Sequence, residues 1–288
     1  MNYLWHLVVI GSVYALLAMA LNLVLGYAGL MSLCHAALFG LGAYVSTLLV
    51  LAGWSFLPAL VVASAACAAI GAALAIPTVR LRGDSFVLAT LAFQVIAIGL
   101  FSNWVSVTGG TFGLANIPAP SVLGVTLDSP VRYGIFAAAV AALCGLLFWR
   151  MLDSPFGRVL RAIREDEVAA IALGKDVNRV KMVAFVVSAA AAAVPGALQA
   201  GYARYIDPTS FTLNEGILVL SMVVIGGAGS LAGPWVGALI TVAIPEVLRV
   251  LAIPDVVAGN LRQILYGALL VLLMRTRPRG VTGRYGFE

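Results

Sequence analysis

Apolar stretches long enough to cross a lipid bilayer recur along this chain and limit what it can fold into. They lie near residues 3–25, 30–51, 57–79, 85–104, 131–151, 182–203, 232–252 and 259–275, with a shorter one at 214–227. Because 62% of the residues are apolar and 10% are charged, a water-soluble domain could not keep enough polar surface. A helix needs about 20 apolar residues to span a bilayer, so we predict an all-α, polytopic membrane helical bundle of about nine (8–10) transmembrane helices. It forms a single domain over residues 1–288.

One charged segment interrupts these apolar stretches. Residues 150–181 contain 12 of the 29 charged side chains of the chain. Taken as one helix from Arg158 to Gly174, the segment gathers apolar side chains on one arc. These residues are Val159, Leu160, Ile163, Ala170 and Ile171. We therefore predict a helix that docks on another surface, the alternative being a solvated loop whose arginines only orient the chain in the membrane.

The basic residues indicate how the bundle is oriented. Nine crossings place the N-terminus outside if the loop of residues 152–181 and the tail of residues 276–288 are both cytoplasmic. Arg80 and Arg82 then lie inside, as the positive-inside rule prefers, whereas Arg132 and Arg204 lie outside against that rule. Broken segments would explain this conflict, which is why the expected number of helices is a range.

Two glycine-rich segments predict breaks in the helices at membrane depth. Gly26 and Gly29 interrupt the first apolar block, and a second interruption contains Gly226, Gly227, Gly229, Gly233 and Pro234. Non-helical backbone is tolerated at that depth only where protein or a watery cavity satisfies it. Both segments contain the pattern Gly-x-Ala-Gly, as an inverted repeat would leave behind. Ordinary tight turns at the membrane surface remain the alternative.

Several polar residues within the apolar stretches are candidates for lining a translocation path. They are Asn22, Ser32, His35, Thr90 and Gln94, with Ser188 and Gln199 as further examples. Polar groups in lipid either bond to neighbouring helices or line a watery cavity. We favour His35, Thr90 and Gln94 for the path, because the last two share a helix face and His35 follows the first break.

The motifs of several other functional classes are missing. The chain has neither a G-x-x-x-x-G-K-[ST] phosphate loop nor an H-E-x-x-H metal motif, and its histidines are His6 and His35. Cys34, Cys67 and Cys144 stand apart, so neither a disulfide framework nor a metal site is indicated. We expect no catalytic residues, no bound ATP and no metal. The isoelectric point near 9.3 reflects membrane-flanking basic residues rather than nucleic-acid binding.

Short blocks of sequence match one family in their order along the chain. They are residues 26–33 (GYAGLMSL), 81–84 (LRGD), 108–110 (TGG), 161–167 (RAIREDE), 222–231 (MVVIGGAGSL) and 277–280 (RPRG). From about residue 11 to residue 283 the chain closely resembles the LivM-type permeases of branched-chain amino acid ABC importers, in the hydrophobic amino acid/urea uptake family.

This resemblance implies a type II-like ABC importer permease in a bacterial inner membrane. Such a subunit forms half of the translocation path for branched-chain or related amino acids and works by alternating access. The implied partners are a second, LivH-like permease, two cytoplasmic ATPase subunits that bind ATP-Mg, and a periplasmic substrate-binding protein, all in contact with membrane lipid. Urea or short-chain amides are the alternative substrates.

The resemblance also implies which residues dock on the ATPase. They are Arg161, Arg164, Glu165, Asp166, Glu167, Ala169, Ala170 and Gly174. ABC importers in general carry the docking signature E-A-A-x-x-x-G, which Ala169, Ala170 and Gly174 match. Val168 stands where the signature has its glutamate, and the acid lies one place earlier, at Glu167. This departure leaves the role of Glu167 open.

Two other classes of protein are weaker alternatives. A proton-coupled secondary carrier would need acids within the membrane, but Asp84, Glu215 and Glu246 all lie near predicted helix ends. An enzyme embedded in the membrane would need a set of reactive side chains that the sequence does not offer. ATP-dependent uptake by a reconstituted complex would separate the carrier from the ABC permease.

Overall fold

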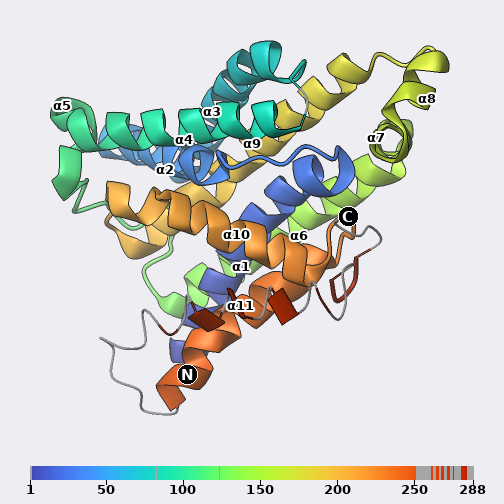
Figure 1. The fold of residues 1–288 in the computed structure, drawn as a ribbon. Coiled ribbons are helices and arrows are strands. Elements are labelled where there is room, and N and C mark those ends of the chain that lie inside the picture. The colour runs from blue at the N-terminus through green and yellow to red at the C-terminus, as the bar shows by residue number, and fades with distance from the viewer. Residues whose placement is uncertain are drawn as a thin grey trace.

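The computed structural model describes residues 2–81, 83–122, 124–250, 261, 264–265, 267–268, 271–272, 275 and 280–283. Over these residues the chain is mostly helical (Figure 1). The long helices are α1 (Asn2–Asn22), α2 (His35–Leu51), α3 (Phe56–Thr78), α4 (Asp84–Asn103), α6 (Pro130–Asp153), α9 (Val177–Ala203), α10 (Leu213–Gly226) and α11 (Gly233–Val250). The shorter ones are the π-helix η1 (Leu23–Tyr27), α5 (Val105–Thr108), α7 (Pro155–Glu165), α8 (Glu167–Ala172) and the 3-10 helices η2 (Gly110–Phe112) and η3 (Pro208–Phe211). A two-stranded hairpin pairs β1 (Ser121–Val122) with β2 (Val125–Thr126).

Fewer membrane-spanning helices than predicted are found in the part of the chain that the structure describes. Within the described residues, six helical segments are long and apolar enough to cross a membrane. The predicted stretch 30–51 forms α2, which has 17 residues. Stretch 232–252 corresponds to α11, and most of stretch 259–275 lies outside the described residues. The prediction of about nine spans is therefore not confirmed, while that of a polytopic helical bundle is.

Helix α9 lies at the centre of the bundle and packs against α1, α2 and α3. Small residues let the backbones approach closely. A Cβ atom on Gly42 of α2 would lie 2.4 Å from the Cα atom of Ala193, and one on Gly71 of α3 would lie 2.5 Å from the Cβ atom of Ala189. Glycine is therefore required at positions 42 and 71, where α2 and α3 closely contact α9.

The peripheral helices expose apolar side chains instead of burying them. Val61 of α3, Leu88 and Ile96 of α4, and Leu147 of α6 are all exposed, and less than a third of each of these spans is buried. Lipid tails are as apolar as these side chains, so a helix in a bilayer gains little by turning them inward. The faces of α3, α4 and α6 are thus suited to lipid or to another apolar subunit.

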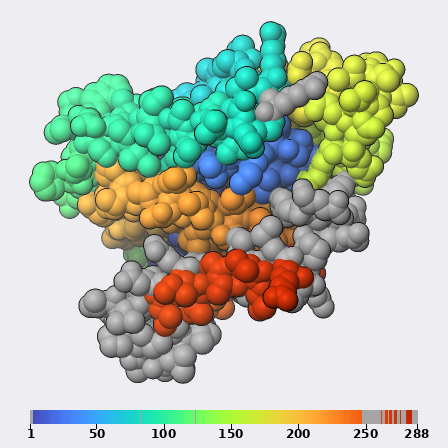
Figure 2. All heavy atoms as spheres, viewed as in Figure 1, coloured from blue at the N-terminus to red at the C-terminus, as the bar shows by residue number. Residues whose placement is uncertain are grey.

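The charged segment forms two helices, so the prediction of one continuous helix from Arg158 to Gly174 is wrong. Helices α7 and α8 meet at Asp166, whose backbone is extended. The Asp166 carboxylate accepts a hydrogen bond from the backbone N–H of Ala169 at 2.9 Å and caps α8. Figure 1 shows the two helices at one edge of the bundle, between the ends of α6 and α9, and Figure 2 shows the same region in yellow-green at that edge. We call residues 152–181 the docking loop.

Candidate functional site

The outer surface of the docking loop is apolar at the tip. Val168, Ile171 and Leu173 expose 72%, 50% and 77% of their surface. We call these three residues the α8 patch. Its side chains stand next to the exposed Ala169, and all lie on or directly after α8. Solvent-exposed apolar residues grouped on a projecting helix are typical of a surface that another protein covers. The sequence predicts Ile171 on the same apolar arc as Leu160, Ile163 and Ala170, but those three are buried and the kink at Asp166 leaves Ile171 exposed.

The inner surface of the loop packs on the start of α9. Ile163 and Ala170 form a small buried cluster with Val177, and Leu160 is buried in the main core. Lys181, which the sequence analysis did not single out, is buried and forms an ion pair with Glu167 at 2.8 Å. The side chains of Lys181 and Glu167 are 10% and 32% exposed. Glu167 therefore fixes the docking loop to α9, and the outward position belongs to Val168.

The remaining predicted docking residues occupy different environments. Glu165 and Asp166 are exposed, and Asp166 is used as the cap of α8. Gly174 ends the α8 turn with a φ of 74°, a left-handed conformation that favours glycine, and a Cβ atom there would meet open space. Arg164 points into the bundle, where its guanidinium donates hydrogen bonds to the carbonyls of Leu25 (2.7 Å) and Gly26.

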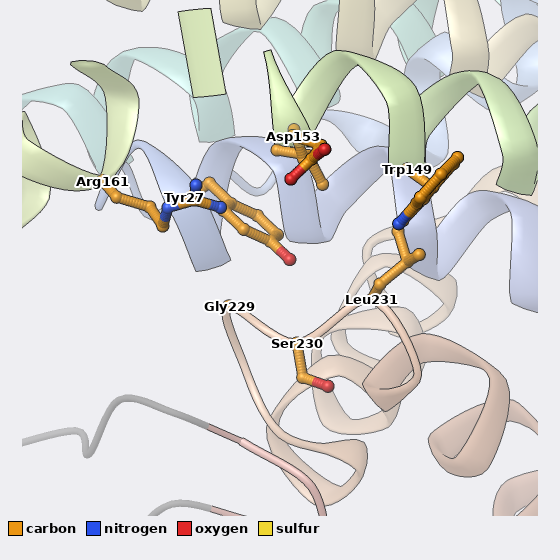
Figure 3. A pocket seen from close by; sticks show the side chains of 8 residues that line it. Tyr27, Trp149, Asp153, Arg161, Gly229, Ser230 and Leu231 are labelled. Atoms are coloured by element: carbon orange, nitrogen blue, oxygen red, sulfur yellow. The ribbon is translucent and has the colours of Figure 1, made fainter. Parts of the chain in front are cut away.

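A half-open pocket of about 210 Å³ lies between the docking loop and the two predicted breaks (Figure 3). It is lined by Tyr27, Trp149, Leu152, Asp153, Arg161, Gly229, Ser230 and Leu231. Arg161 and Tyr27 lie on one side of this space, and Gly229 and Ser230 of the second break lie across from them. The pocket thus joins three segments that are far apart in the sequence.

The two glycine-rich segments contact one another across the bundle. Asn22 connects them, because its Nδ2 donates to the carbonyl of Ser230 at 2.9 Å and its Oδ1 accepts from the N–H of Gly229 at 3.0 Å. A Cβ atom on Gly26 would lie 2.5 Å from the Gly229 nitrogen, so the close approach needs glycine. The first segment is helical through Tyr27 in the π form and becomes irregular after it.

The second segment turns sharply between α10 and α11. Gly227 has a φ of 112°, and a Cβ atom on Gly226 would overlap the carbonyl oxygen of Gly233, which with Pro234 starts α11. The carbonyls of Ile225 and Gly226 accept hydrogen bonds from the N–H groups of Val281 and Thr282 at 3.0 and 2.9 Å. Residues near the end of the chain therefore satisfy the backbone that the turn leaves open.

The five candidate path residues are all buried, with at most 3% of their surface exposed. His35 lies 3.2 Å from Ser32 through Nδ1 and 2.7 Å from Ser188 through Nε2. The Ser188 hydroxyl donates its one hydrogen to the carbonyl of Ala20 at 2.5 Å. Nε2 therefore carries the proton and donates to Ser188, and Nδ1 accepts from Ser32.

Thr90 and Gln94 of α4 bond to the chain around the start of α2. Thr90 Oγ1 accepts from the N–H of Leu33 at 3.2 Å, and Gln94 Oε1 accepts from the N–H of Ala37 at 2.7 Å. Gln94 Nε2 also donates to the carbonyl of Phe211 at 2.8 Å. These side chains hold the irregular segment after η1 and the turn before α10 in place, in the conformation that the structure describes.

Together these features define a polytopic helical membrane protein with two helix breaks in contact and an apolar projection outside the bundle. The chain belongs to the family of permease components of branched-chain amino acid transport systems, whose model matches residues 3–274. It is a transport permease, a class of membrane protein that carries a solute across the bilayer.

Named relatives agree with this family. The chain is 34% identical to the high-affinity branched-chain amino acid transport system permease protein LivM of Escherichia coli, over 93% of this chain and 67% of that protein. It is 28% identical to the corresponding LivH of Escherichia coli, over 96% and 93% of the two chains. It is also 28% identical to BraD of Pseudomonas aeruginosa, over 98% and 96%. No solved structure matches the chain.

Proposed function

We propose that this protein is one of two permease subunits of an ATP-driven importer for branched-chain amino acids. Family membership supports the transport role, and the substrate class follows the names of the LivM, LivH and BraD relatives. The second subunit would be a LivH-like permease, and the complex would lie in a bacterial inner membrane. A periplasmic binding protein delivers the amino acid in this proposal.

The α8 patch is the observation that carries the ATP-driven part of the proposal. Val168 and Leu173 are among the most exposed large apolar side chains of the described chain, on a loop rich in charge. A groove on a cytoplasmic ATPase that covers this patch would remove apolar surface from water, and the exposed acids Glu165 and Asp166 beside α8 would fix the register. Two such ATPases, with ATP-Mg bound to them rather than to this chain, would drive alternating access.

The candidate path residues take a definite role within this proposal. Asn22, Ser32, His35, Thr90 and Gln94 close the bundle in the conformation described here, and their hydrogen bonds would have to separate when the path opens. Few polar groups among apolar neighbours suit a solute with a leucine-like side chain, since strong binding would hold the solute rather than release it.

Reconstitution with the proposed partners tests the function. The two permeases and two ATPases are placed in liposomes with ATP inside and a loaded binding protein outside, and uptake of labelled leucine, isoleucine, valine and urea is compared. We expect concentrative leucine-type uptake that requires ATP and both permeases. Uptake of urea but of no amino acid would show that the proposed substrate class is wrong. ATP-independent concentrative uptake by this chain alone would show that the protein is a secondary carrier and not an ABC permease.

A further inference from the structure

Arg164 completes the C-terminal end of the first membrane span. The last carbonyls of a helix have no partners within the helix and carry the negative end of its dipole. In η1, the carbonyls of Leu23 and Val24 accept from the N–H groups of Ala28 (3.2 Å) and Leu30 (3.0 Å). The next two carbonyls, of Leu25 and Gly26, accept from the Arg164 guanidinium. A cation from the docking loop therefore caps a helix 139 residues earlier in the chain.

The local backbone allows this contact. Gly29 has a φ of 69°, which turns the chain aside after η1, and a Cβ atom at that position would lie 3.5 Å from Cγ of Arg164. The side chain of Arg164 thus passes directly beside the glycine to reach the carbonyls. Since Arg is always charged and offers several donors in a fixed plane, it can hold two carbonyls at once.

The same helix end is joined to the second break. Asn22, directly ahead of η1, bonds to the backbone of both Gly229 and Ser230, and Gly26 touches the Gly229 nitrogen closely enough to exclude a Cβ atom. One chain of contacts from the docking loop to the second break therefore runs through Arg164, η1 and Asn22. A π-helical turn is a strained, adjustable piece of helix that recurs at functional sites, which suits a segment that changes shape.

We propose that Arg164 is the positioning residue through which movement of the docking loop reaches both helix breaks. The inference rests on the proposed function, since it takes the docking loop to be moved by an ATPase. When α7 shifts, the guanidinium carries the carbonyls of Leu25 and Gly26 with it, and Asn22 transfers the displacement to Gly229 and Ser230. Arg164 then acts on the membrane domain, although the family resemblance implied a contact with the ATPase.

The coupling between uptake and ATP hydrolysis tests this role. Arg164→Met keeps the length of the side chain but donates no hydrogen bond, and Arg158→Met is the matched control. Arg158 lies on the same helix, is exposed, and donates to the backbone of Asp153 just ahead of that helix. In the reconstituted complex we expect Arg164→Met to lower the solute taken up per ATP hydrolysed by at least about tenfold, as loss of charge-assisted hydrogen bonds predicts. The control should match the wild type.

A conservative variant and a local probe separate coupling from folding. Arg164→Lys keeps the charge and can donate to one carbonyl, so it should recover part of the solute uptake per ATP hydrolysed. Ser230→Cys, in a background without Cys34, Cys67 and Cys144, reports on the second break through its rate of thiol labelling. We expect nucleotide trapping to change that rate in the parent and in Arg158→Met but not in Arg164→Met.

The possible results are distinct. Asn22→Ala should lower the ratio in the same way, and Arg164→Met with Asn22→Ala should be no worse than the more severe single variant, because the two residues lie in one chain of contacts. If Arg164→Met lowers only the amount of protein in the membrane, and keeps both the ratio and the labelling change, Arg164 merely caps a helix and the proposal is wrong. Absence of ATP-driven uptake by the assembled wild type would instead refute the proposed function.

Discussion

At the residue scale, the displaced acid of the docking signature has a structural explanation. Glu167 turns toward α9 and pairs with the buried Lys181, while Val168, one residue later, is exposed. The sequence showed an acid shifted by one place but could not show its partner. Lys181 itself is a signal in the sequence, because a lysine at the edge of an apolar stretch must find an acid, a carbonyl or water.

Removing either charge of the Glu167–Lys181 pair should destabilise the protein more than removing both. Glu167→Met leaves the Lys181 ammonium buried without its partner, and we expect a loss of about 1–2 kcal/mol, below the 3–5 kcal/mol of a fully buried pair because Glu167 is a third exposed. Glu167→Met with Lys181→Met should regain most of that loss. Thermal unfolding of the detergent-purified chain measures this, and equal losses in the single and double variants would contradict the pairing.

The backbone conformation at Gly174, rather than the space around it, should decide which substitutions preserve uptake. With a φ of 74° and open space around a Cβ atom, any L-residue is strained there, but asparagine tolerates the left-handed region better than alanine. We expect Gly174→Asn to keep more uptake than Gly174→Ala, although asparagine is larger. If uptake instead falls with the size of the side chain, the position touches the ATPase and bulk is what matters.

At the scale of elements, the docking loop shows what periodicity can and cannot predict. The apolar spacing of Leu160, Ile163 and Ala170 predicted the face of a helix that docks on another surface, whereas all three side chains are buried within this chain. It also placed Ile171 on that face, since a helical period was continued through Asp166. Aspartate is a preferred N-cap residue, so the sequence contained a signal for a new helix, but the competing 3.6-residue pattern concealed it.

Charges in the α8 patch should block assembly with the ATPases without harming the permease itself. Val168→Asp and Leu173→Asp replace side chains that are mostly in water, so neither should disturb the folded chain. We expect each to lower the amount of ATPase that co-purifies with the permease by at least about tenfold, as burying an unpaired charge in an interface predicts.

A matched control for the α8 patch lies in the hairpin of β1 and β2. Val125 is an exposed valine far from the docking loop in the sequence, and Val125→Asp adds the same charge to the surface. This variant should keep its ATPases. If all three variants retain them, the docking loop serves only to orient the chain, which was the alternative interpretation of its arginines.

At the scale of the whole molecule, the sequence predicted the class of fold but not the contacts that close it. Apolar length alone indicated a polytopic bundle, because a bilayer imposes that length on every span. Nothing local indicated that Gly26 would meet Gly229, or that Gln94 would bond to the carbonyl of Phe211. Such long-range pairs depend on how all helices pack together. The number of spans was not confirmed for a related reason, since a short helix such as α2 and a broken block look alike in hydropathy.

The translocation path can therefore be located only by comparing different conformations of the whole molecule. His35, Thr90 and Gln94 are buried, and each joins α2 or the segment before it to another part of the bundle. If the path runs between these parts, the hydrogen bonds must open in at least one nucleotide state. Single cysteines at positions 35, 90 and 94, in a background without Cys34, Cys67 and Cys144, report such an opening.

We expect these three cysteines to be unreactive toward a small polar thiol reagent in the conformation described here and to become reactive when nucleotide traps the assembled complex. A rise of about tenfold in the labelling rate would correspond to a change of roughly 1.4 kcal/mol in the free energy of exposing the cysteine. Ala137→Cys is the control, because Ala137 is fully buried on α6 and is not a candidate path residue. Labelling at position 137 that rises equally would indicate general loosening of the bundle. Cysteines at 35, 90 and 94 that stay unreactive in every state would show that these side chains hold helices together, and the path would have to be sought elsewhere.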